Sequence, residues 1–230
     1  MWRILVVEDV RDTREMLISE LQEEFEDVQV DGAACVEDAL RLVEQAIESR
    51  RPYDVVLLDF KLPVRMGEND EVDESVCRQV RDSMLDAYIL HYTGYGGDPV
   101  ISRHMEQEHG RDRPDQARTR LVEKTADTTW VEELRDHVRS FLDGKRKRLA
   151  RQRVAEGLDR LFGAPESGHP GAARARDLGR PGDRGISHEL EALRHDIVTY
   201  WNDLDDQLKD RVGTIFRVEE GDEGVRVALR

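Results

Sequence analysis

The sequence predicts an α/β protein whose first 143 residues form a doubly wound, five-stranded parallel sheet with helices on both faces. Two observations support this fold class. Short apolar runs alternate five times with amphipathic stretches, which is the pattern of a parallel sheet covered by helices. In addition, the run DVVLLDF at residues 54–60 is nearly all apolar between its two Asp, as expected of a central strand that is buried on both faces.

The apolar runs give the five expected strands, which lie at residues 4–10, 28–30, 54–60, 87–93 and 119–124. The stretches between them carry apolar residues at intervals of three and four, the spacing of one helix face. In the first two helices these residues are Met16, Leu17, Leu21 and Phe25, followed by Val36, Ala39, Leu40, Val43 and Ile47. A last amphipathic helix begins near Thr129, and its pattern extends through residues 144–162 as a connecting helix.

The remaining residues differ in composition. Residues 163–186 are rich in Gly, Pro, Ala and Arg and have almost no large apolar side chains, which predicts a flexible linker. Residues 187–230 are predicted to be a small module of one helix and one β-hairpin. The hairpin strands are expected at residues 214–219 and 225–229, around the turn EGDEG. The function of this module is unassigned.

The helix of this module carries a long apolar stripe. The helix is predicted to begin at Ser187, a good N-cap, and its apolar residues recur at intervals of three and four through Trp201 and Leu204 to Ile215. One hairpin is too small to cover so long a stripe. We therefore expect the stripe to pack against the first domain, a second copy of the chain in a homodimer, or another protein.

Charge is distributed unevenly along the chain. The 230 residues carry 35 Lys plus Arg against 50 Asp plus Glu, a formal net charge of −15. Residues 1–144 hold 18 of the basic and 34 of the acidic residues, a net of −16, whereas residues 145–230 hold 17 and 16, a net of +1. An acidic first domain would repel nucleic acid phosphates and is suited to gathering a cation.

Several classes of protein are excluded by the sequence. No run approaches the roughly 20 apolar residues needed to cross a bilayer, so we expect a soluble protein without a membrane contact. The N-terminal apolar run stops at Glu8 and Asp9 and lacks the pattern of a signal peptide, which favours a cytoplasmic location. Cys35 and Cys77 lie far apart without metal-ligand spacing, and we expect both to be reduced and structural.

Polar side chains stand at the ends of four expected strands: Glu8 and Asp9, Asp59, Thr93, and Lys124. In a sheet of order 2-1-3-4-5 the first and third strands are neighbours, so the three carboxylates would converge. Their repulsion would be relieved by a hard divalent cation with oxygen ligands, and Mg²⁺ fits this role. Such a site can accept a phosphoryl group on a carboxylate, with Lys124 and the metal neutralising charge and Thr93 donating a hydrogen bond.

These residues carry a resemblance to a known family. Residues 1–143 resemble the receiver domain of bacterial two-component response regulators. The matching residues are Glu8, Asp9, Asp59 in VVLLDFKLP, Pro63, Gly67, Thr93, Gly94 and Lys124. No single motif carries this resemblance, which depends on the ordered spacing of all of them.

The resemblance implies a flavodoxin-like receiver fold and a response regulator that signals through a downstream protein partner. Asp59 would be phosphorylated by a cognate histidine kinase, and Thr93 and Lys124 would contact the phosphoryl group. Mg²⁺ would be held by Glu8, Asp9, Asp59 and the backbone carbonyl of Lys61. We expect no enzyme activity beyond self-dephosphorylation, because no glycine-rich ATP-binding region of a kinase follows.

The sequence departs from the family at four positions. Thr125 follows Lys124 where the family usually has Pro, and Leu121 stands where an aromatic switch residue is expected. Lys61 and Tyr95 occupy the two positions at which the family tunes hydrolysis of the acyl phosphate. We expect their bulk to obstruct the attacking water and to prolong the phosphorylated state.

Three alternatives accompany this interpretation. The string LRHDIVTYWNDL resembles the phosphoacceptor box of some histidine kinases, so a phosphorelay intermediate that uses His195 is one alternative. A pseudo-receiver scaffold that is never phosphorylated is another. The third is nucleic acid binding by the basic run KRKRLARQR at residues 145–153. Nothing after this run resembles a helix-turn-helix, so nucleic acid is not expected as a partner.

Overall fold

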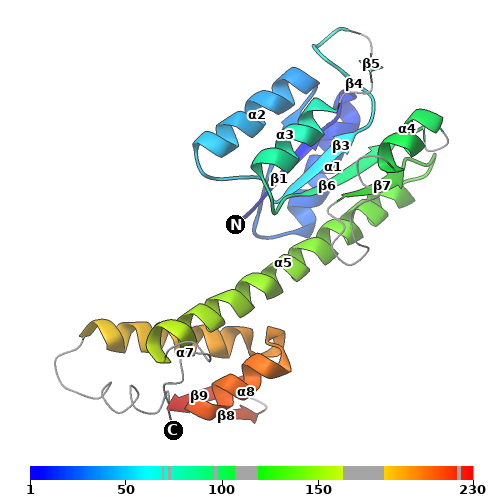
Figure 1. The fold of residues 1–230 in the computed structure, drawn as a ribbon. Coiled ribbons are helices and arrows are strands. Elements are labelled where there is room, and N and C mark those ends of the chain that lie inside the picture. Colours follow the sequence, from blue (N-terminus) through cyan, green and yellow to red (C-terminus); the bar gives the residue numbers. More distant parts are fainter. Residues whose placement is uncertain are drawn as a thin grey trace. The chain divides into compact units, whose positions relative to one another are not determined.

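A computed structural model describes residues 1–68, 70–71, 74–95, 98–106, 119–162, 184–221 and 224–229 of the chain (Figure 1). The chain divides into two compact units, Met1–Phe141 and Leu142–Arg230. The division falls inside one long helix, so each unit is described by itself.

The first unit is built on a parallel sheet of five strands. These are β1 (Trp2–Val7), β2 (Val28–Ala33), β3 (Val55–Asp59), β6 (Tyr88–Thr93) and β7 (Thr119–Glu123). Their order is β2-β1-β3-β6-β7, and every neighbouring pair is parallel. The predicted fold class and strand order are thus confirmed. A short antiparallel pair, β4 (Leu62–Pro63) with β5 (Asp70–Glu71), follows β3 and was not predicted.

Helices cover both faces of this sheet (Figure 1). They are α1 (Arg11–Glu24), α2 (Val36–Glu48), α3 (Ser75–Ser83), the short α4 (Pro99–His104) and the first part of α5 (Thr129–Phe162). One core lies between the sheet and the pair α2 and α3, where Val43 and Val80 are fully buried against Val56. None of the helices within the described ranges is long and apolar enough to cross a membrane.

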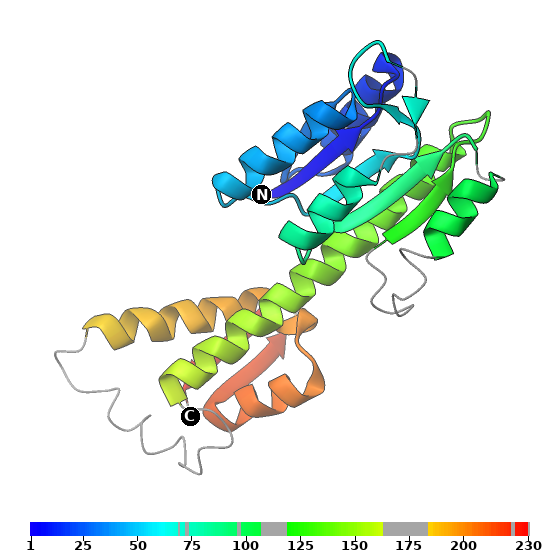
Figure 2. The same ribbon diagram turned by 45° about the horizontal axis from the view of Figure 1, so that its top comes forward.

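The second unit contains the rest of α5, then α7 (Arg184–Tyr200), the short 3-10 helix η3 (Trp201–Asp203), α8 (Asp206–Ile215) and the antiparallel hairpin β8 (Phe216–Gly221) and β9 (Gly224–Leu229). Figures 1 and 2 show α7, α8 and the hairpin gathered around the second half of α5. Residues 163–183 of the expected linker lie outside the described residues. The helix after it begins at Arg184 rather than Ser187.

The prediction of one long helix through Ile215 was wrong. The chain turns between α7 and α8, because Leu204 is extended (φ −77°, ψ 142°) and Asp205 caps a new helix by accepting a hydrogen bond from the backbone N–H of Leu208. A pair of helices joined by a short turn therefore follows the basic run. The premise that only one helix and a hairpin follow it is corrected accordingly.

The apolar stripe does pack on a partner outside residues 187–230, but this partner is none of the three that were expected. Its residues pack against α5, whose Val154 and Leu158 are fully buried, and against Phe216 at the start of the hairpin. The two helices approach closely at Gly157, where a Cβ atom would lie 2.8 Å from Leu193 Cδ1. The stripe is therefore covered within the second unit.

We expect Ile197→Ala to weaken the second unit and to spare the first. Ile197 is fully buried, and truncating such a side chain costs about 2–5 kcal/mol. Hydrogen exchange of the full chain should show faster exchange in α7, α8 and the second half of α5, with the sheet unchanged. The neighbouring Val198→Ala is the matched control, because Val198 is 40% exposed. Equal effects of the two substitutions would contradict this packing.

Candidate functional site

Three carboxylates meet at the carboxyl edge of the sheet. Glu8 and Asp9 directly follow β1, and Asp59 ends the neighbouring strand β3. One carboxylate oxygen from each of the three lies within 4.8 Å of the other two. Glu8 is fully buried and Asp59 is 8% exposed, whereas Asp9 is half-buried. The predicted convergence of these side chains is present in the structure.

Lys124 provides the positive charge beside these carboxylates. Its Nζ lies 2.9 Å from Glu8 Oε2 and 2.5 Å from Asp59 Oδ2. Its backbone N–H donates to the carbonyl of Thr93 (2.7 Å), which fixes the end of β7 against β6. From this position the side chain extends to the end of β3. The ammonium group thus connects the ends of three strands.

The electrostatics of this cluster follow from burial and crowding. Burial and the nearby carboxylate of Asp59 raise the pKa of Glu8 to about 7, against the opposing effect of Lys124. Burial also raises the pKa of Asp59, and Lys124 opposes this as well. Burial lowers the pKa of Lys124, but the two carboxylates outweigh burial and raise it. One ammonium therefore compensates the carboxylates only in part.

The remaining polar atoms around Asp59 are also oriented. Asp59 Oδ1 accepts hydrogen bonds from the backbone N–H groups of Phe60 (2.6 Å) and Lys61 (3.5 Å). Thr93 is fully buried, and its Oγ1 accepts from the backbone N–H of Tyr95 (3.1 Å). Since a hydroxyl that accepts still has a proton to donate, Thr93 can hydrogen-bond an anionic group that arrives at this edge.

The donor set fits a hard divalent cation. All three candidate ligands are carboxylates, they lie within reach of one ion, and Lys124 leaves part of their charge uncompensated. Oxygen ligands and few protein carboxylates are what Mg²⁺ takes in proteins.

Sequence reasoning missed two residues that support the site. Tyr92 is fully buried, its hydroxyl donates to the carbonyl of Val7 (3.0 Å), and its ring lies 4.8 Å from Lys124 Nζ and stacks on Trp130. Arg14 Nη1 donates to the carbonyl of Glu8 (2.6 Å) and holds the loop after β1. The only sequence signal for Tyr92 is its place next to Thr93 in an apolar strand.

A third missed residue, Asp98, takes part in a contact between the loops that follow β3 and β6. Lys61 Nζ lies 3.3 Å from Asp98 Oδ2 and 3.9 Å from the centre of the Tyr95 ring. The loop after β3 is thereby joined to the loop after β6, and we name these three side chains the loop clasp. Lys61 and Tyr95 were singled out from the sequence for their positions and their bulk, and the structure also shows them in contact.

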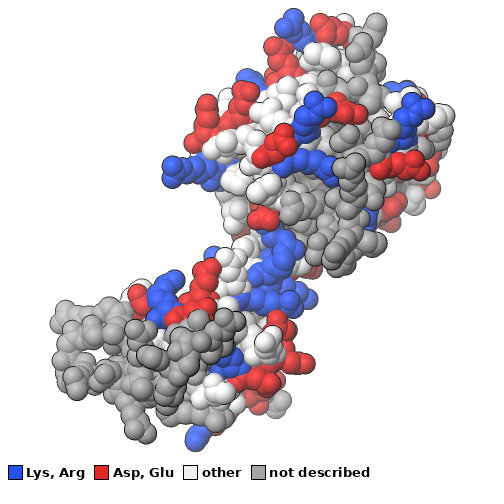
Figure 3. All heavy atoms as spheres, in the orientation of Figure 1, with Lys and Arg blue, Asp and Glu red and all other residues white. Residues whose placement is uncertain are grey.

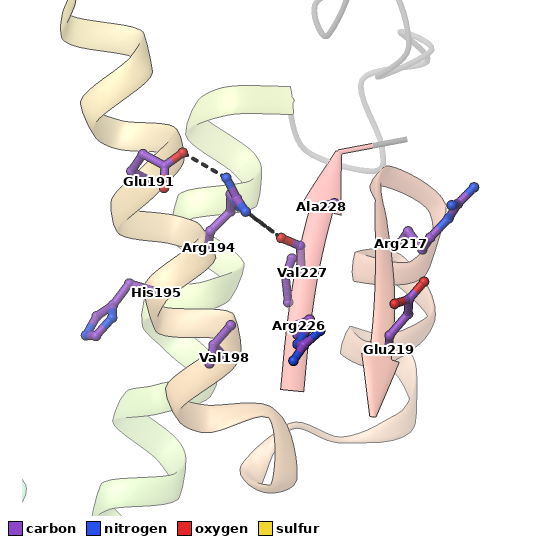
Figure 4. A pocket seen from close by; sticks show the side chains of 9 residues that line it. All are labelled: Glu191, Arg194, His195, Val198, Arg217, Glu219, Arg226, Val227 and Ala228. Carbon is purple, nitrogen blue, oxygen red and sulfur yellow. Dashed lines mark hydrogen bonds and ion pairs between the residues drawn. The ribbon is translucent and has the colours of Figure 1, made fainter. Parts of the chain in front are cut away.

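His195 lies on α7 in the second unit and is exposed. It borders an open groove of about 670 Å³ between α7 and the hairpin. Figure 4 shows Arg194 reaching across to the carbonyl of Val227, with distances of 2.7 and 3.0 Å, while His195 points away from the strands. His195 and the acidic cluster thus belong to different units of the chain.

No protein-family model matches the sequence, and no curated protein matches it significantly. Solved structures similar to this one include several that cover 61–64% of the chain. A response regulator protein from Thermotoga maritima, solved with Mg²⁺ and BeF, is 28% identical over 61% of this chain and 99% of its own, with a TM-score of 0.42. The HemR receiver domain from Leptospira biflexa is 20% identical over 61% and 94%, with a TM-score of 0.44.

We expect Lys124→Met to destabilise the first unit. The substitution leaves buried carboxylates without their cation, and breaking a buried ion pair from one side costs about 3–5 kcal/mol. Faster hydrogen exchange of the backbone amides of β1 and β3 would report this loss. The Glu8→Gln, Lys124→Met double variant removes a carboxylate as well and should lose less. An equal or larger loss in the double variant would contradict the assigned role of Lys124.

Proposed function

We propose that residues 1–143 are a receiver domain and that the protein is a response regulator which accepts a phosphoryl group on Asp59 from a histidine kinase. The observation that carries this proposal is the setting of Asp59. It is a mostly buried carboxylate at a sheet edge, held by Lys124 and two backbone N–H groups and flanked by two further acids. Burying a carboxylate in this way lowers the stability of the folded protein. Its presence therefore favours a functional role.

The transfer step requires a nucleophile and charge neutralisation. A carboxylate oxygen of Asp59 attacks the phosphorus of a phosphohistidine, the O–P bond forms as the N–P bond breaks, and the imidazole leaves with the electron pair. Lys124 and the Thr93 hydroxyl contact the transferred oxygens. Glu8, Asp9, Asp59 and the backbone carbonyl of Lys61 would hold Mg²⁺, which supplies charge neutralisation on those oxygens.

The output is proposed to be a protein interaction. Thr93 ends β6 and Lys124 directly follows β7, and these are the last two strands of the sheet. A phosphoryl group bound to both residues therefore favours one conformation of that side of the domain. A downstream protein that binds this conformation better would receive the signal. Hydrolysis of the acyl phosphate by the domain itself would end the signal.

The decisive experiment is intact mass spectrometry after incubation with Mg²⁺ and acetyl phosphate. We expect one phosphoryl adduct on the wild type, no adduct on Asp59→Asn, and an unchanged adduct on His195→Gln. An acid-labile adduct that disappears in His195→Gln would favour a phosphorelay intermediate, since His195 is exposed. No adduct on any of the three proteins, with acetyl phosphate or with a histidine kinase, would favour a pseudo-receiver scaffold.

The loop clasp should lengthen the life of the phosphorylated state. Lys61 follows Asp59 by two residues, Tyr95 follows Thr93 by two, and Asp98 holds Lys61 in place, so we expect the clasp to hinder water that approaches Asp59. We therefore expect the phosphoryl half-life to shorten severalfold in the Lys61→Asn, Tyr95→Ala variant, measured by the decay of the mass adduct. Asp98→Asn keeps the bulk but removes the ion pair, and an intermediate half-life is expected. An unchanged half-life in the double variant would count against the clasp.

A further inference from the structure

The part of α5 that belongs to the second unit carries a dense positive charge. Six of the nine residues 145–153 are Lys or Arg, and none of the nine is acidic. Lys147, Arg148 and Arg151 are all exposed. Lys147 and Arg148 precede Arg151 by four and three residues, so these three side chains lie on one side of the helix. We name them the basic face.

Within the basic face, only Arg151 has acidic partners among the described residues. Arg151 Nε donates to the carbonyl of Asp203 (3.0 Å) and lies 3.9 Å from Asp205 Oδ2. Lys147 and Arg148 form no ion pair with any residue that the structure describes. Cations three and four residues apart on a helix repel each other. The basic face therefore gains from an anionic partner.

A negatively charged surface lies directly beside the basic face. The turn between α7 and α8 and the first residues of α8 contain Asp203, Asp205, Asp206 and Asp210, which we name the acidic turn. Asp206 and Asp210 are exposed and are without an ion pair among the described residues. The contacts of Arg151 place the two surfaces next to each other. Figure 3 shows Lys and Arg atoms gathered on this stretch of α5, with Asp and Glu atoms beside them.

We propose that a second copy of this chain docks here, with the basic face of each copy on the acidic turn of the other. Two adjacent patches of opposite charge are self-complementary under a twofold rotation, which is the requirement for an isologous dimer. Residues 145–230 carry a net charge of only +1, so the second units of two copies do not repel each other strongly. The proposal concerns the second unit and does not depend on phosphorylation of Asp59.

The same features disfavour the two other kinds of anionic partner. The carboxylate of Asp205 lies 3.9 Å from Arg151 of the basic face and would repel nucleic acid phosphates there. A helix that lies on a lipid surface needs an apolar face beside its cations. On the exposed stretch of α5 the large apolar side chain is Leu149, which is 40% exposed and stands alone.

The test is the oligomeric state of the full chain by sedimentation. We expect a dimer at about 50 mM salt that dissociates at about 0.5 M salt, because the contacts are between exposed charges. Lys147→Glu with Arg148→Glu should weaken dimerisation by about tenfold or more, and Asp206→Lys with Asp210→Lys should do the same. Combining all four substitutions should restore the dimer, because both surfaces then have the opposite sign of charge and again attract each other.

The matched control is Arg153→Glu with Arg160→Glu. It changes the charge by the same amount at exposed positions on the opposite side of α5, and the dimer should persist. Circular dichroism checks that each variant is folded. If a variant does not fold, the salt dependence of wild-type dimerisation tests the proposal in its place. A wild type that is monomeric at low salt, or a four-substitution variant that stays monomeric, would overturn the proposal. A monomer that duplex DNA retains at low salt would overturn it in favour of nucleic acid.

Discussion

The candidate site depends on one interaction, the contact of the Lys124 ammonium with the buried carboxylates of Glu8 and Asp59. Three separate strands supply these groups, so the contact forms only when β1, β3 and β7 have the correct order. Without the ammonium, two carboxylates would face each other in a region of low dielectric. With it, the cluster is stable yet still short of positive charge. That shortage is what makes the edge suited to a divalent cation and a transferred phosphoryl group.

The meeting of these side chains at one edge of the sheet could be predicted from the sequence, because the order of the strands determines which strand ends are neighbours. Each of Glu8, Asp59 and Lys124 follows or ends an apolar run, and parallel strands place such positions at one edge. Supporting contacts were beyond this reasoning. Asp98 meets Lys61 only because two loops of irregular structure approach each other, and no periodic pattern reports such an approach. Tyr92 was hidden because a buried tyrosine in a strand resembles an ordinary core residue.

The errors in the second unit have a different physical origin. Apolar residues keep the helical spacing from Trp201 through Leu204 to Leu208, although the backbone turns between them. Periodicity shows that a side chain is buried, but a turn that keeps its apolar residues directed at the same core leaves the pattern intact. Periodicity also does not identify the covering element. Val154 and Leu158 lie before the segment 163–183, and only the folded chain shows that they cover the stripe.

The helix α5 belongs to two cores, and this limits how the protein can be divided. Its Leu134 and Val138 are buried in the first unit, and its Val154 and Leu158 are buried in the second. Arg135 also binds Glu20 of α1 (2.8 Å), which holds the beginning of the helix to the first unit. A module cut at Ser187 would lose the helix that covers its apolar stripe. The sequence places the end of the first domain at residue 143 and separates residues 144–162 from residues 187–230 by a linker, whereas the cores join α5 after residue 141 to the C-terminal helices in one unit.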